Sequence, residues 1–431
     1  MTAEATEAEL AAARRLLGRA ESNGQAPPDG EPGPGRWWGH PLAPGRDVAA
    51  GEATQAMIDE FRRWLHLPDA GALLVTLAAV AANGGPGDPV WLLLVGPPGG
   101  GKTELLAPLA GLRHFHSAAT MSEAALLSGT PKREVAGGAK GGLLREIGEF
   151  GIIVCKDFGS VLSMHREARA GLLAALREIY DGAWTRHVGA DGGRALHWAG
   201  KVGVVGACTP SIDSHHAVMG AMGERFVLYR LPPVDADAQA RRALTHVGQE
   251  RAMRRALSDA VAVALGAARM DRLAEPVAEA DTTRLVEVAT LAVRCRSAVE
   301  RDTYSREIEL IPEPEAPARL ALVLLRLRNG LAALGVDDSE AWRLVAKAAL
   351  DSMPKVRRVV VEELLAAADR RSTTSLAESI GYPTTTARRA LEDLAAHGVV
   401  VRESQGPGKA DLWGVSTWAA SRWPRGPKAV K

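Results

Sequence analysis

Between residues 37 and 233 the chain alternates between amphipathic stretches and short runs of apolar residues. The stretches Glu52–Leu65 and Ala70–Ala82 have the hydrophobic spacing of helices. The compact apolar runs are Val90–Val95, Gly151–Cys155 and Lys201–Ala207, with a weaker one at Arg225–Leu231. Helices that alternate with continuously apolar strands are typical of a largely parallel sheet covered on both faces. We therefore predict an α/β domain over this part of the chain.

The rest of the chain divides by pattern and composition. Residues 5–21 have the spacing of a short amphipathic helix, and residues 22–36 are rich in Gly and Pro, as flexible linkers are. Beyond residue 233 the helical runs are Ala236–Gly266, Asp281–Val299 and Ala318–Leu334, with almost no strand signal. We predict five regions: an N-terminal helix and linker (1–36), the α/β core (37–233), a helical region (234–351), a winged-helix domain (352–420) and a basic tail (421–431).

The pattern near the C-terminus predicts a winged helix. The helical runs there are Pro354–Ala368, Thr374–Ile380 and Thr384–His397. The tight turn Gly381-Tyr382-Pro383 separates the second helix from the third, which Gly398 ends. The strands that follow are Val399–Glu403 and Asp411–Val415, on either side of a Gly-containing loop. This order of three helices and a β-hairpin is that of a winged helix-turn-helix domain.

The third helix of this domain carries side chains suited to DNA. Its N-terminal half presents Thr384, Thr385, Thr386, Arg388 and Arg389, and Lys409 lies in the loop between the strands. Such side chains contact base edges in the major groove and the flanking phosphates. From residue 352 onward there are 13 Lys and Arg against 8 Asp and Glu, in a chain of net charge +1. We predict DNA contacts by Thr385, Arg388, Arg389 and Lys409. A winged helix that binds a protein is the alternative.

Composition excludes few other classes. A hydrophobic fraction of 46% and a charged fraction of 24% are ordinary for a globular protein. The 3 cysteines, Cys155, Cys208 and Cys295, lack metal-ligand spacing, so we expect buried, unpaired thiols. The acidic start MTAEATEAEL has no apolar signal region, and no stretch reaches the length of a membrane span. We expect a cytoplasmic protein without membrane contact.

A phosphate-binding loop is the most specific chemical signal in the chain. The strand Val90–Val95 leads directly into a glycine-rich segment, and a helix opens after it. The segment comprises Gly96, Pro97, Pro98, Gly99, Gly100, Gly101, Lys102 and Thr103. In a P-loop the glycines let several backbone N–H groups point at one phosphate, and the following helix adds its positive end. We predict that this segment and Glu104 bind ATP, with Lys102 on the β- and γ-phosphates and the Thr103 hydroxyl on Mg²⁺.

An acidic partner for this Mg²⁺ is expected at the end of the next core strand but one. That strand is Gly151–Cys155, and Asp157 is the only acid at its carboxyl end. A carboxylate in this place can support the metal and orient the attacking water. We predict Asp157 as a catalytic residue and metal ligand. Capping of the following turn is the alternative role.

The order of four short motifs resembles that of AAA+ ATPases. The motifs are the loop from Gly96, the strand from Gly151 to Phe158, the turn Ala207–Pro210 and the element Gly223–Phe226. The likeness is greatest to the clade that contains the minichromosome-maintenance helicases, and it spans about residues 90–233. It implies an AAA+ P-loop sandwich with a mainly parallel sheet, an all-α lid over residues 234–351, and ATPase activity that uses ATP and Mg²⁺.

The resemblance also implies roles for single residues. Thr209 falls on the first sensor, which hydrogen-bonds the γ-phosphate or its water, and turn capping is the alternative. Arg225 falls on the arginine finger, which reaches the site of a neighbouring subunit, so self-association into a ring or filament is implied. A surface salt bridge is the alternative for Arg225. Arg319 falls on the second sensor of the lid.

One position departs from the family pattern. In the clade Asp-Glu-Phe follows the strand, whereas this chain has Lys156-Asp157-Phe158. Asp157 then aligns with the catalytic Glu, and Lys156 with the Asp that supports Mg²⁺. Because a lysine repels a metal cation, either Lys156 turns away or the register differs by one and Asp157 is the metal-side acid. In both cases one carboxylate replaces two, which favours slow hydrolysis.

A second DNA-contacting element is expected between Trp184 and Trp198. Two β-compatible arms there flank the turn Ala190–Gly193. In the helicases named above a hairpin at this position projects into the central channel and touches DNA. Arg186 and Arg194 are therefore candidate phosphate contacts. A structural hairpin is the alternative.

Two hypotheses of different classes follow. The first is an ATP-hydrolysing, helicase-like or initiator-like protein that couples nucleotide state to DNA remodelling or unwinding. The second is a winged-helix transcriptional regulator whose DNA affinity depends on nucleotide, with slow or no hydrolysis. The motif order and the hairpin favour the first. Lys156 favours the second, as does the winged helix, which resembles the DNA-binding domains of small bacterial repressors.

Overall fold

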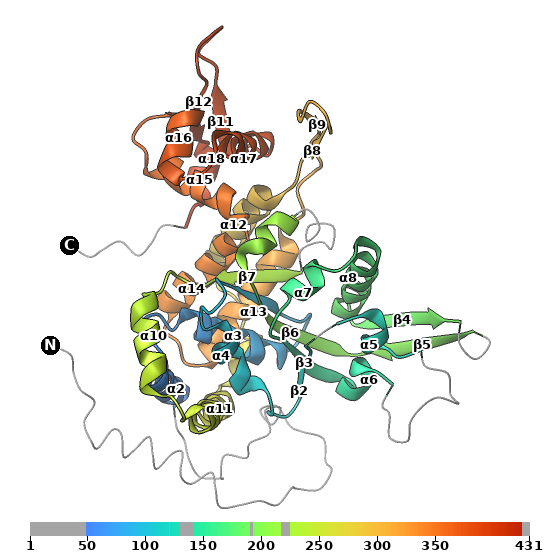
Figure 1. Cartoon of the computed structure of the whole chain (residues 1–431). Coiled ribbons are helices and arrows are strands. Elements are labelled where there is room, and N and C mark those ends of the chain that lie inside the picture. The colour runs from blue at the N-terminus through green and yellow to red at the C-terminus, as the bar shows by residue number, and fades with distance from the viewer. Residues whose placement is uncertain (1–48, 120, 130–140, 190–192, 217–224, 425–431) are drawn as a thin grey trace, which may run out of the picture.

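A computed structural model describes residues 49–119, 121–129, 141–189, 193–216 and 225–424. At its centre is a five-stranded sheet with the order β2-β3-β6-β1-β7 (Figure 1). The strands are β1 (Trp91–Val95), β2 (Phe115–Ser117), β3 (Phe150–Cys155), β6 (Lys201–Cys208) and β7 (Phe226–Arg230). Each pair of neighbours in this sheet is parallel. The predicted α/β fold with a mainly parallel sheet is confirmed, although the short β2 was not predicted.

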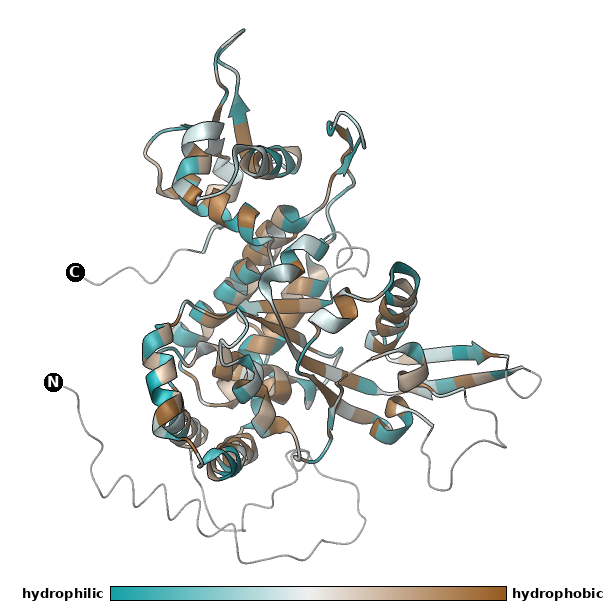
Figure 2. Cartoon of the chain, viewed as in Figure 1, coloured by the Kyte–Doolittle hydropathy of each residue, from teal (hydrophilic) through white to brown (hydrophobic). Residues whose placement is uncertain are grey.

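Side chains of the central strands alternate between two apolar cores. Leu92 and Leu94 of β1 pack into one core, and Trp91 and Leu93 pack into the other. The helices on the first face include α2 (Ala50–Trp64), α3 (Gly71–Asn83) and α4 (Lys102–Leu106). Those on the second face are α5 (Glu123–Leu126), α6 (Leu143–Ile147), α7 (Gly159–Leu162) and α8 (Arg166–Tyr180). Figure 2 shows the resulting hydrophobic centre, with hydrophilic residues on the outer helices. Burial on both faces explains why these strands are continuously apolar.

The helices that follow the sheet pack on the same face as α2 and α3. They are α10 (Ala236–Thr245), α11 (Glu250–Ala267), α12 (Glu279–Arg296), α13 (Ala318–Ala333) and α14 (Asp338–Asp351). Helix α13 approaches α3 so closely that a Cβ at Gly330 would lie 2.2 Å from the carbonyl oxygen of Ala78. One apolar core runs from α2 through α11, α12, α13 and α14 into the C-terminal domain. The helical region therefore shares its core with the sheet.

Two features of the helical region differ from the sequence prediction. The run 236–266 was predicted as one helix, but α10 and α11 are separate, with Gly248 between them at a φ of +83° that helices do not continue through. A hairpin of β8 (Glu300–Arg301) and β9 (Ile308–Leu310) was not predicted. Its strands are too short to show a period, and its turn is set by the carboxylate of Asp302, which accepts the N–H groups of Tyr304 and Ser305.

The C-terminal domain has the predicted winged-helix order. Its elements are α15 (Lys355–Ala366), α16 (Thr373–Ile380), α17 (Thr384–Ala396), β11 (Val400–Glu403) and β12 (Leu412–Val415). Gly381 ends α16 with a φ of +68°, which makes the tight turn before α17. Two elements were not predicted: β10 (Arg371–Ser372), which pairs with β12, and the final helix α18 (Thr417–Arg422). Figure 1 shows this domain seated on the helical region, at the end of the molecule away from α10 and α11.

Three smaller expectations can be compared with the structure. The cysteines are buried and free, as predicted, and burial raises the pKa of Cys155 to about 11. Within the described ranges no helix is both long and apolar enough to cross a membrane. The helix predicted at 5–21, the turn residues 190–192 and the basic tail beyond 424 lie outside the described residues.

Candidate functional site

The predicted P-loop connects β1 to α4 at the carboxyl edge of the sheet. Gly99 and Gly101 have φ values of +73° and +79°, a region that L side chains rarely adopt. A Cβ at Gly99 would meet nothing within 4 Å, so the requirement for glycine there is conformational. At Gly100 a Cβ would lie 3.0 Å from the carbonyl oxygen of Pro97. The glycines thus form the tightly curled backbone that a phosphate-binding loop requires.

The side chain of Lys102 lies inside this loop. Its Nζ donates to the carbonyl oxygens of Gly96, at 2.7 Å, and Pro97, at 2.6 Å. Burial lowers the pKa of Lys102, and the neighbouring Cys208 and Asp157 partly oppose that shift. An ammonium group held only by two carbonyl oxygens can exchange them for phosphate oxygens, to which charged hydrogen bonds are stronger.

Three loops meet at this edge because β6 lies between β1 and β3. The N–H of Gly96 donates to the carbonyl of Cys208 at 3.2 Å, and the N–H of Phe158 donates to the carbonyl of Ala207 at 2.7 Å. Asp157 and Thr209 therefore follow strands that end beside the P-loop. Open parallel sheets bind their ligands at the carboxyl ends of the strands. The structure thus brings Lys102, Asp157 and Thr209 to one edge.

The carboxylate predicted to bind Mg²⁺ at this edge already has a structural partner. Asp157 Oδ1 accepts the N–H of Gly159 at 2.9 Å, which is the turn-capping role named as its alternative. Lys156 and Asp157 are both exposed between β3 and α7. Thr209 Oγ1 lies 2.6 Å from Ser211 Oγ. One carboxylate and the exposed Thr103 hydroxyl fit a Mg²⁺ ion that takes its other ligands from phosphates and water.

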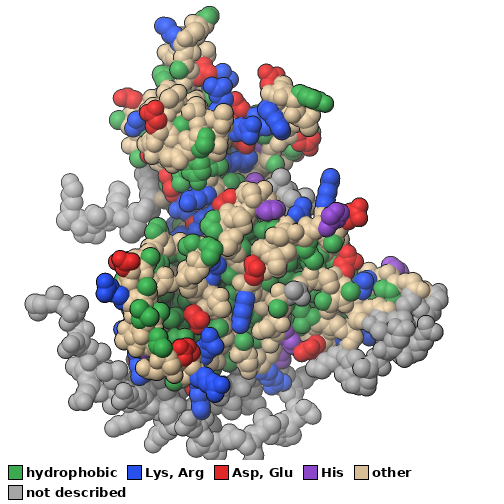
Figure 3. All heavy atoms as spheres, in the orientation of Figure 1, with side chains coloured by type: hydrophobic (Ala, Val, Ile, Leu, Met, Phe, Trp, Pro, Cys, Tyr) green, Lys and Arg blue, Asp and Glu red, His purple; other side chains and the backbone are tan. Residues whose placement is uncertain are grey.

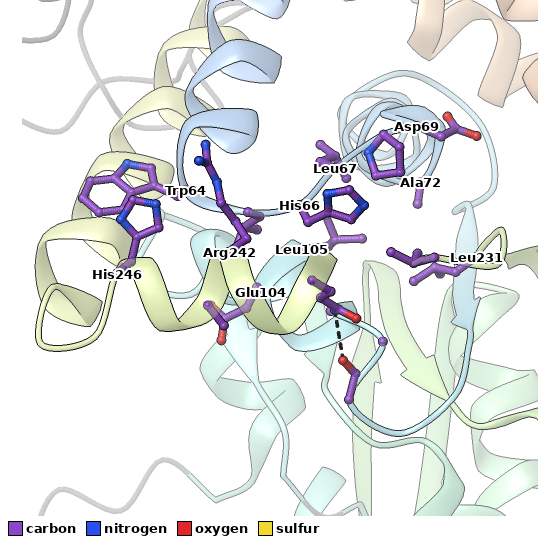
Figure 4. A pocket seen from close by; sticks show the side chains of 18 of the residues that line it. Trp64, His66, Leu67, Asp69, Ala72, Glu104, Leu105, Leu231, Arg242 and His246 are labelled. Carbon is purple, nitrogen blue, oxygen red and sulfur yellow. Dashed lines mark hydrogen bonds between the residues drawn. The ribbon is translucent and has the colours of Figure 1, made fainter. Parts of the chain in front are cut away.

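A cavity of about 340 Å³ opens beside the crest of the P-loop (Figure 4). It lies between residues Gly99–Gly101, the connection from α2 to α3, and the helices α10 and α11. Its apolar lining includes Trp64, Leu65, Leu67, Ala72, Leu105, Leu231 and Met253. The volume is within the range of small-molecule sites, and an apolar lining with a few polar groups is typical of them. The cavity is therefore a candidate small-molecule site that adjoins the glycine-rich loop.

Helix α10 covers this cavity, and two of its side chains hold it there by hydrogen bonds. Within α10 no residue is buried. Gln239 Nε2 donates to the carbonyl of Gly99 at 3.1 Å, and Arg242 Nη2 donates to the carbonyls of Arg62 and Arg63, at 2.6 and 2.5 Å. At the far end of the helix the centroids of the His246 and Trp64 rings are 4.8 Å apart. Figure 4 shows these two rings next to each other. Neither Gln239 nor Arg242 was predicted from the sequence.

The two other predicted arginines lie away from the P-loop. Arg225 precedes β7 and is 7% exposed, with its Nη2 2.8 Å from Asp181 Oδ2 and its guanidinium 5.2 Å from the Tyr180 ring. The salt bridge named as its alternative is present, between the buried guanidinium of Arg225 and the exposed carboxylate of Asp181. Arg319 lies at the start of α13, bonded to Glu315 at 2.8 Å.

The edge of the sheet that holds these arginines is opposite the P-loop. Phe226, the neighbour of Arg225, pairs with Trp91 at the first position of β1, whereas the P-loop follows the last. Arg319 influences the pKa of Tyr180, whose ring packs on Trp91. Neither arginine can reach its own P-loop in this arrangement. The finger and second-sensor roles stay predictions that require a neighbouring copy.

The predicted hairpin between the second and third motifs is present. Its strands are β4 (Ala183–Val188) and β5 (Arg194–Ala199), and Figure 1 shows it projecting from the side of the sheet. The guanidinium of Arg186 donates to the carbonyl of Leu127 and lies 3.9 Å from Glu123 Oε2. Arg194 is half-buried opposite Val188. DNA contact by these two arginines stays a prediction, and Arg186 is engaged within the protein.

The predicted DNA-contacting residues of α17 share one open face. Thr384, Thr385, Arg388 and Arg389 are exposed, and Ala387, Ala390 and Leu391 between them are buried. Lys409 is exposed in the loop between β11 and β12. Figure 3 shows Lys and Arg side chains on the C-terminal domain and between it and the β8–β9 hairpin. The helix can therefore present hydroxyl and guanidinium groups to a duplex without rearrangement.

The other half of α17 is fixed to the body of the protein. Arg301 of β8 donates to Glu392 at 2.9 Å and to Asp393 at 2.6 Å. Arg357 of α15 donates to the second oxygen of Asp393 at 2.8 Å. Asp393 is thus held from two elements, which leaves the N-terminal turns of α17 outward and its C-terminal turns anchored. Sequence analysis could not find these anchors, because the partners lie far apart in the chain.

Residues 363–404 match the family of the IclR helix-turn-helix domain. The matched segment runs from the end of α15 through α16 and α17 to the end of β11. The chain therefore carries a helix-turn-helix DNA-binding domain of the IclR type near its C-terminus, as the winged-helix pattern predicted. No curated protein matches the chain.

Proposed function

We propose that this chain is a transcriptional regulator whose affinity for DNA depends on a nucleoside triphosphate bound at the P-loop, and that it hydrolyses this nucleotide slowly. One observation carries the proposal: a DNA-binding domain with an open recognition face occurs on the same chain as a curled glycine loop that opens onto a small-molecule cavity. A nucleotide whose affinity differs between the DNA-bound and the DNA-free chain must change the affinity of the chain for DNA by the same factor.

Three groups support a triphosphate as the ligand. The backbone of Gly99–Gly101 is curled as phosphate loops are, and Lys102 brings a cation to its centre. The adjoining cavity accepts a base. Thr103 and Asp157 would hold Mg²⁺, which neutralises charge on the phosphates when bound. ATP is the nucleotide that the resemblance to AAA+ proteins favours.

Slow hydrolysis follows from the charge at the edge of the sheet. Lys156 occupies the position at which a second carboxylate would support the metal. The carboxylate of Asp157 already accepts a hydrogen bond from the backbone N–H of Gly159. Arg225 and Arg319, the arginines predicted to stabilise charge on the transferring phosphoryl group, lie at the opposite edge. A single chain therefore has few groups to lower the barrier, although it has all it needs to bind.

The decisive experiment measures DNA affinity against nucleotide. A preferred duplex is first selected from a random pool with the purified chain, and its dissociation constant is then measured by fluorescence anisotropy with Mg²⁺ alone, ADP or a non-hydrolysable ATP analogue. We expect a shift of about fivefold or more with the analogue. Lys102→Ala should abolish the shift and leave nucleotide-free DNA binding unchanged. Equal affinities in all three conditions would contradict the proposal.

A second candidate function is a DNA-stimulated ATPase that acts as an assembly. It is favoured by the position of Arg225 and Arg319, which only a neighbouring copy could bring to a P-loop. Arg225 would then leave Asp181 on assembly. Light scattering with nucleotide and DNA, together with steady-state turnover, tests this candidate. A monomer with turnover unaffected by DNA excludes it.

A further inference from the structure

Arg230, the last residue of β7, makes a dense set of contacts beside the candidate nucleotide site. Its Nη1 and Nη2 donate to the two carboxylate oxygens of Asp213, at 2.8 and 2.7 Å. Its Nε donates to the carbonyl of Asp351 at 3.0 Å, and its Nη2 also donates to the carbonyl of Met353 at 3.0 Å. The side chain is 12% exposed. A planar guanidinium with this many hydrogen bonds fixes the relative positions of the residues that accept them.

The backbone of Arg230 belongs to the strand beside the P-loop. Arg230 pairs with Val95, and the N–H of the next residue, Leu231, donates to the Val95 carbonyl at 2.8 Å. Val95 directly precedes Gly96, the first residue of the P-loop. The same strand end leads into the cavity, which Leu231 lines. Arg230 is therefore anchored at the nucleotide edge by its main chain.

Asp213, the partner of the guanidinium, belongs to the segment that begins at Thr209. This segment is the 3₁₀-helix η4 (Pro210–His215), whose N-cap is Thr209. The carboxylate of Asp213 has a second hydrogen-bond partner, because its Oδ1 accepts the backbone N–H of Lys355 at 3.0 Å. Lys355 is the first residue of α15, the helix that opens the DNA-binding domain. Asp213 thus joins the candidate γ-phosphate sensor to that domain.

Asp351 closes the same cluster from the end of α14. It is fully buried at 0% exposure, and its Oδ2 accepts the backbone N–H of Arg230 at 2.8 Å. Lys347 and Arg358 also pair with its carboxylate. Arg358 lies on α15, so a second contact ties this helix to the end of β7. Buried carboxylates with several donors hold a specific arrangement, since an unpaired charge there is costly.

Helix α15 links these contacts to α17, the helix predicted to contact DNA. Arg357, the neighbour of Arg358, bonds to Asp393 of α17 at 2.8 Å and to the carbonyl of Ser297 at 2.6 Å. It is 7% exposed. A displacement of the N-terminus of α15 must therefore move Asp393 or break these contacts.

We propose that Arg230 and Asp213 are positioning residues that carry the state of the nucleotide site to α17. A phosphate that engages Thr209 moves η4, and Asp213 transfers this movement to Arg230 and to the first N–H of α15. The inference rests on the proposed function, because it supplies the physical link that a nucleotide-dependent regulator needs. If the cluster is only a structural brace, its loss lowers stability without changing the dependence of DNA affinity on nucleotide.

The sharpest test removes one N–H from the connection. Lys355→Pro eliminates the donor to Asp213, and the ring Cδ that replaces the hydrogen pushes the Asp213 carboxylate away from the start of α15. Proline is tolerated at the first position of a helix. The preceding Pro354 already has a φ of −54° and a ψ of 133°, which a following proline favours. Lys355→Ala is the matched control, because it removes the exposed side chain and keeps the N–H.

A second pair of variants addresses the guanidinium. Arg230→Lys keeps the positive charge and removes the fork that binds both Asp213 oxygens and the Met353 carbonyl. Arg343→Lys is its control, since Arg343 also forms a double contact with a carboxylate, Glu340 at 2.6 Å, but reaches no part of the DNA-binding domain. Melting temperatures measured beforehand show which variants are folded.

The readout is the ratio of DNA dissociation constants without and with a non-hydrolysable ATP analogue and Mg²⁺, measured on the full chain. We expect a ratio of about five or more in the unmodified chain and in both controls. In Lys355→Pro and Arg230→Lys the ratio should fall to near one, with ATP affinity and nucleotide-free DNA affinity each changed less than about twofold. Should one of the two variants not fold, the other decides.

The possible outcomes distinguish a failure of this inference from a failure of the proposed function. A ratio that persists in the folded Lys355→Pro or Arg230→Lys chain overturns this inference and leaves the proposed function standing. A ratio of one in the unmodified chain overturns the proposed function and the inference with it. A ratio lost equally in Lys355→Ala or Arg343→Lys assigns the effect to general destabilisation and also overturns the inference.

Discussion

Gln239 and Gly99 lie 140 positions apart in the chain, and the side-chain amide of Gln239 donates to the carbonyl oxygen of Gly99 over 3.1 Å. Gln239 belongs to α10, a helix without a buried residue, and Gly99 belongs to the crest of the P-loop. Few other contacts hold α10 over the cavity. The closure of this site is therefore set by individual hydrogen bonds, which a ligand or a point substitution can change.

We predict that Gln239→Ala accelerates the release of nucleotide. A hydrogen bond of this kind contributes about 0.5–1.5 kcal/mol, so the dissociation rate should rise about two- to tenfold. Stopped-flow measurement with a fluorescent ATP analogue gives this rate directly. Asp237→Asn is the control, because Asp237 is exposed on the same helix. An unchanged rate in Gln239→Ala would show that α10 does not retain the ligand.

The parts of this molecule that the sequence predicted are those encoded by neighbouring residues. The P-loop is a contiguous segment whose glycines, lysine and flanking strand each have a local signal. The winged helix likewise follows from helix periods, Gly381 and a hairpin within one short stretch. The long core strands were found because burial on both faces makes them continuously apolar.

The parts that the sequence did not predict are assembled from distant residues. Arg230 and Asp213 look like ordinary charged residues at the end of a strand and within a turn, and only the fold brings both to the start of α15. No sequence pattern marks Gln239 either, because its contact with Gly99 depends on the position of α10 in the fold. The hairpin β8–β9 was missed because two or three residues per strand show no period. Tertiary placement, rather than local propensity, decides these sites.

The charge at the metal-binding edge can be altered with one substitution. We predict that Lys156→Asp increases steady-state ATP turnover about tenfold or more, because a second carboxylate would support Mg²⁺ and free Asp157 to orient water. The site is exposed, so the change should not disturb the core. Lys156→Ala serves as the control that removes the repulsion without adding a ligand. Turnover equal in the two variants, with ATP affinity retained, would mean that Lys156 is not what limits hydrolysis.

The DNA interface can be tested through its salt dependence. We predict that Arg388→Ala and Arg389→Ala each weaken duplex binding and reduce the slope of log affinity against log salt by about 1, because each removes one phosphate-neutralising cation. Anisotropy titrations at several salt concentrations measure both quantities. Arg269→Ala is the control, since Arg269 is exposed far from the winged helix and pairs with Asp271. If both α17 variants kept the salt-dependence slope of the unmodified chain, the DNA interface would have to lie elsewhere on the chain.

Stability should depend on pH through His216, the residue that follows η4. Burial, with a contribution from the nearby Arg357, lowers the pKa of His216 from 6.5 to about 4 in the folded chain. Between these values the unfolded chain binds more protons than the folded one, so the free energy of unfolding must fall as pH falls. The full shift corresponds to about 3 kcal/mol, present above pH 6.5 and lost on acidification towards pH 4.

We predict that His216→Gln removes much of this dependence. Urea denaturation at several pH values between 7 and 4.5 should show a shallower loss of stability in the variant than in the unmodified chain. His187→Gln is the control, because His187 is exposed on β4 and should leave the profile unchanged. Parallel profiles for the His216→Gln and unmodified chains would mean that groups other than His216 govern acid unfolding. His216 would then be protonated in the folded chain as readily as in the unfolded one, which its burial and the nearby positive charge of Arg357 argue against.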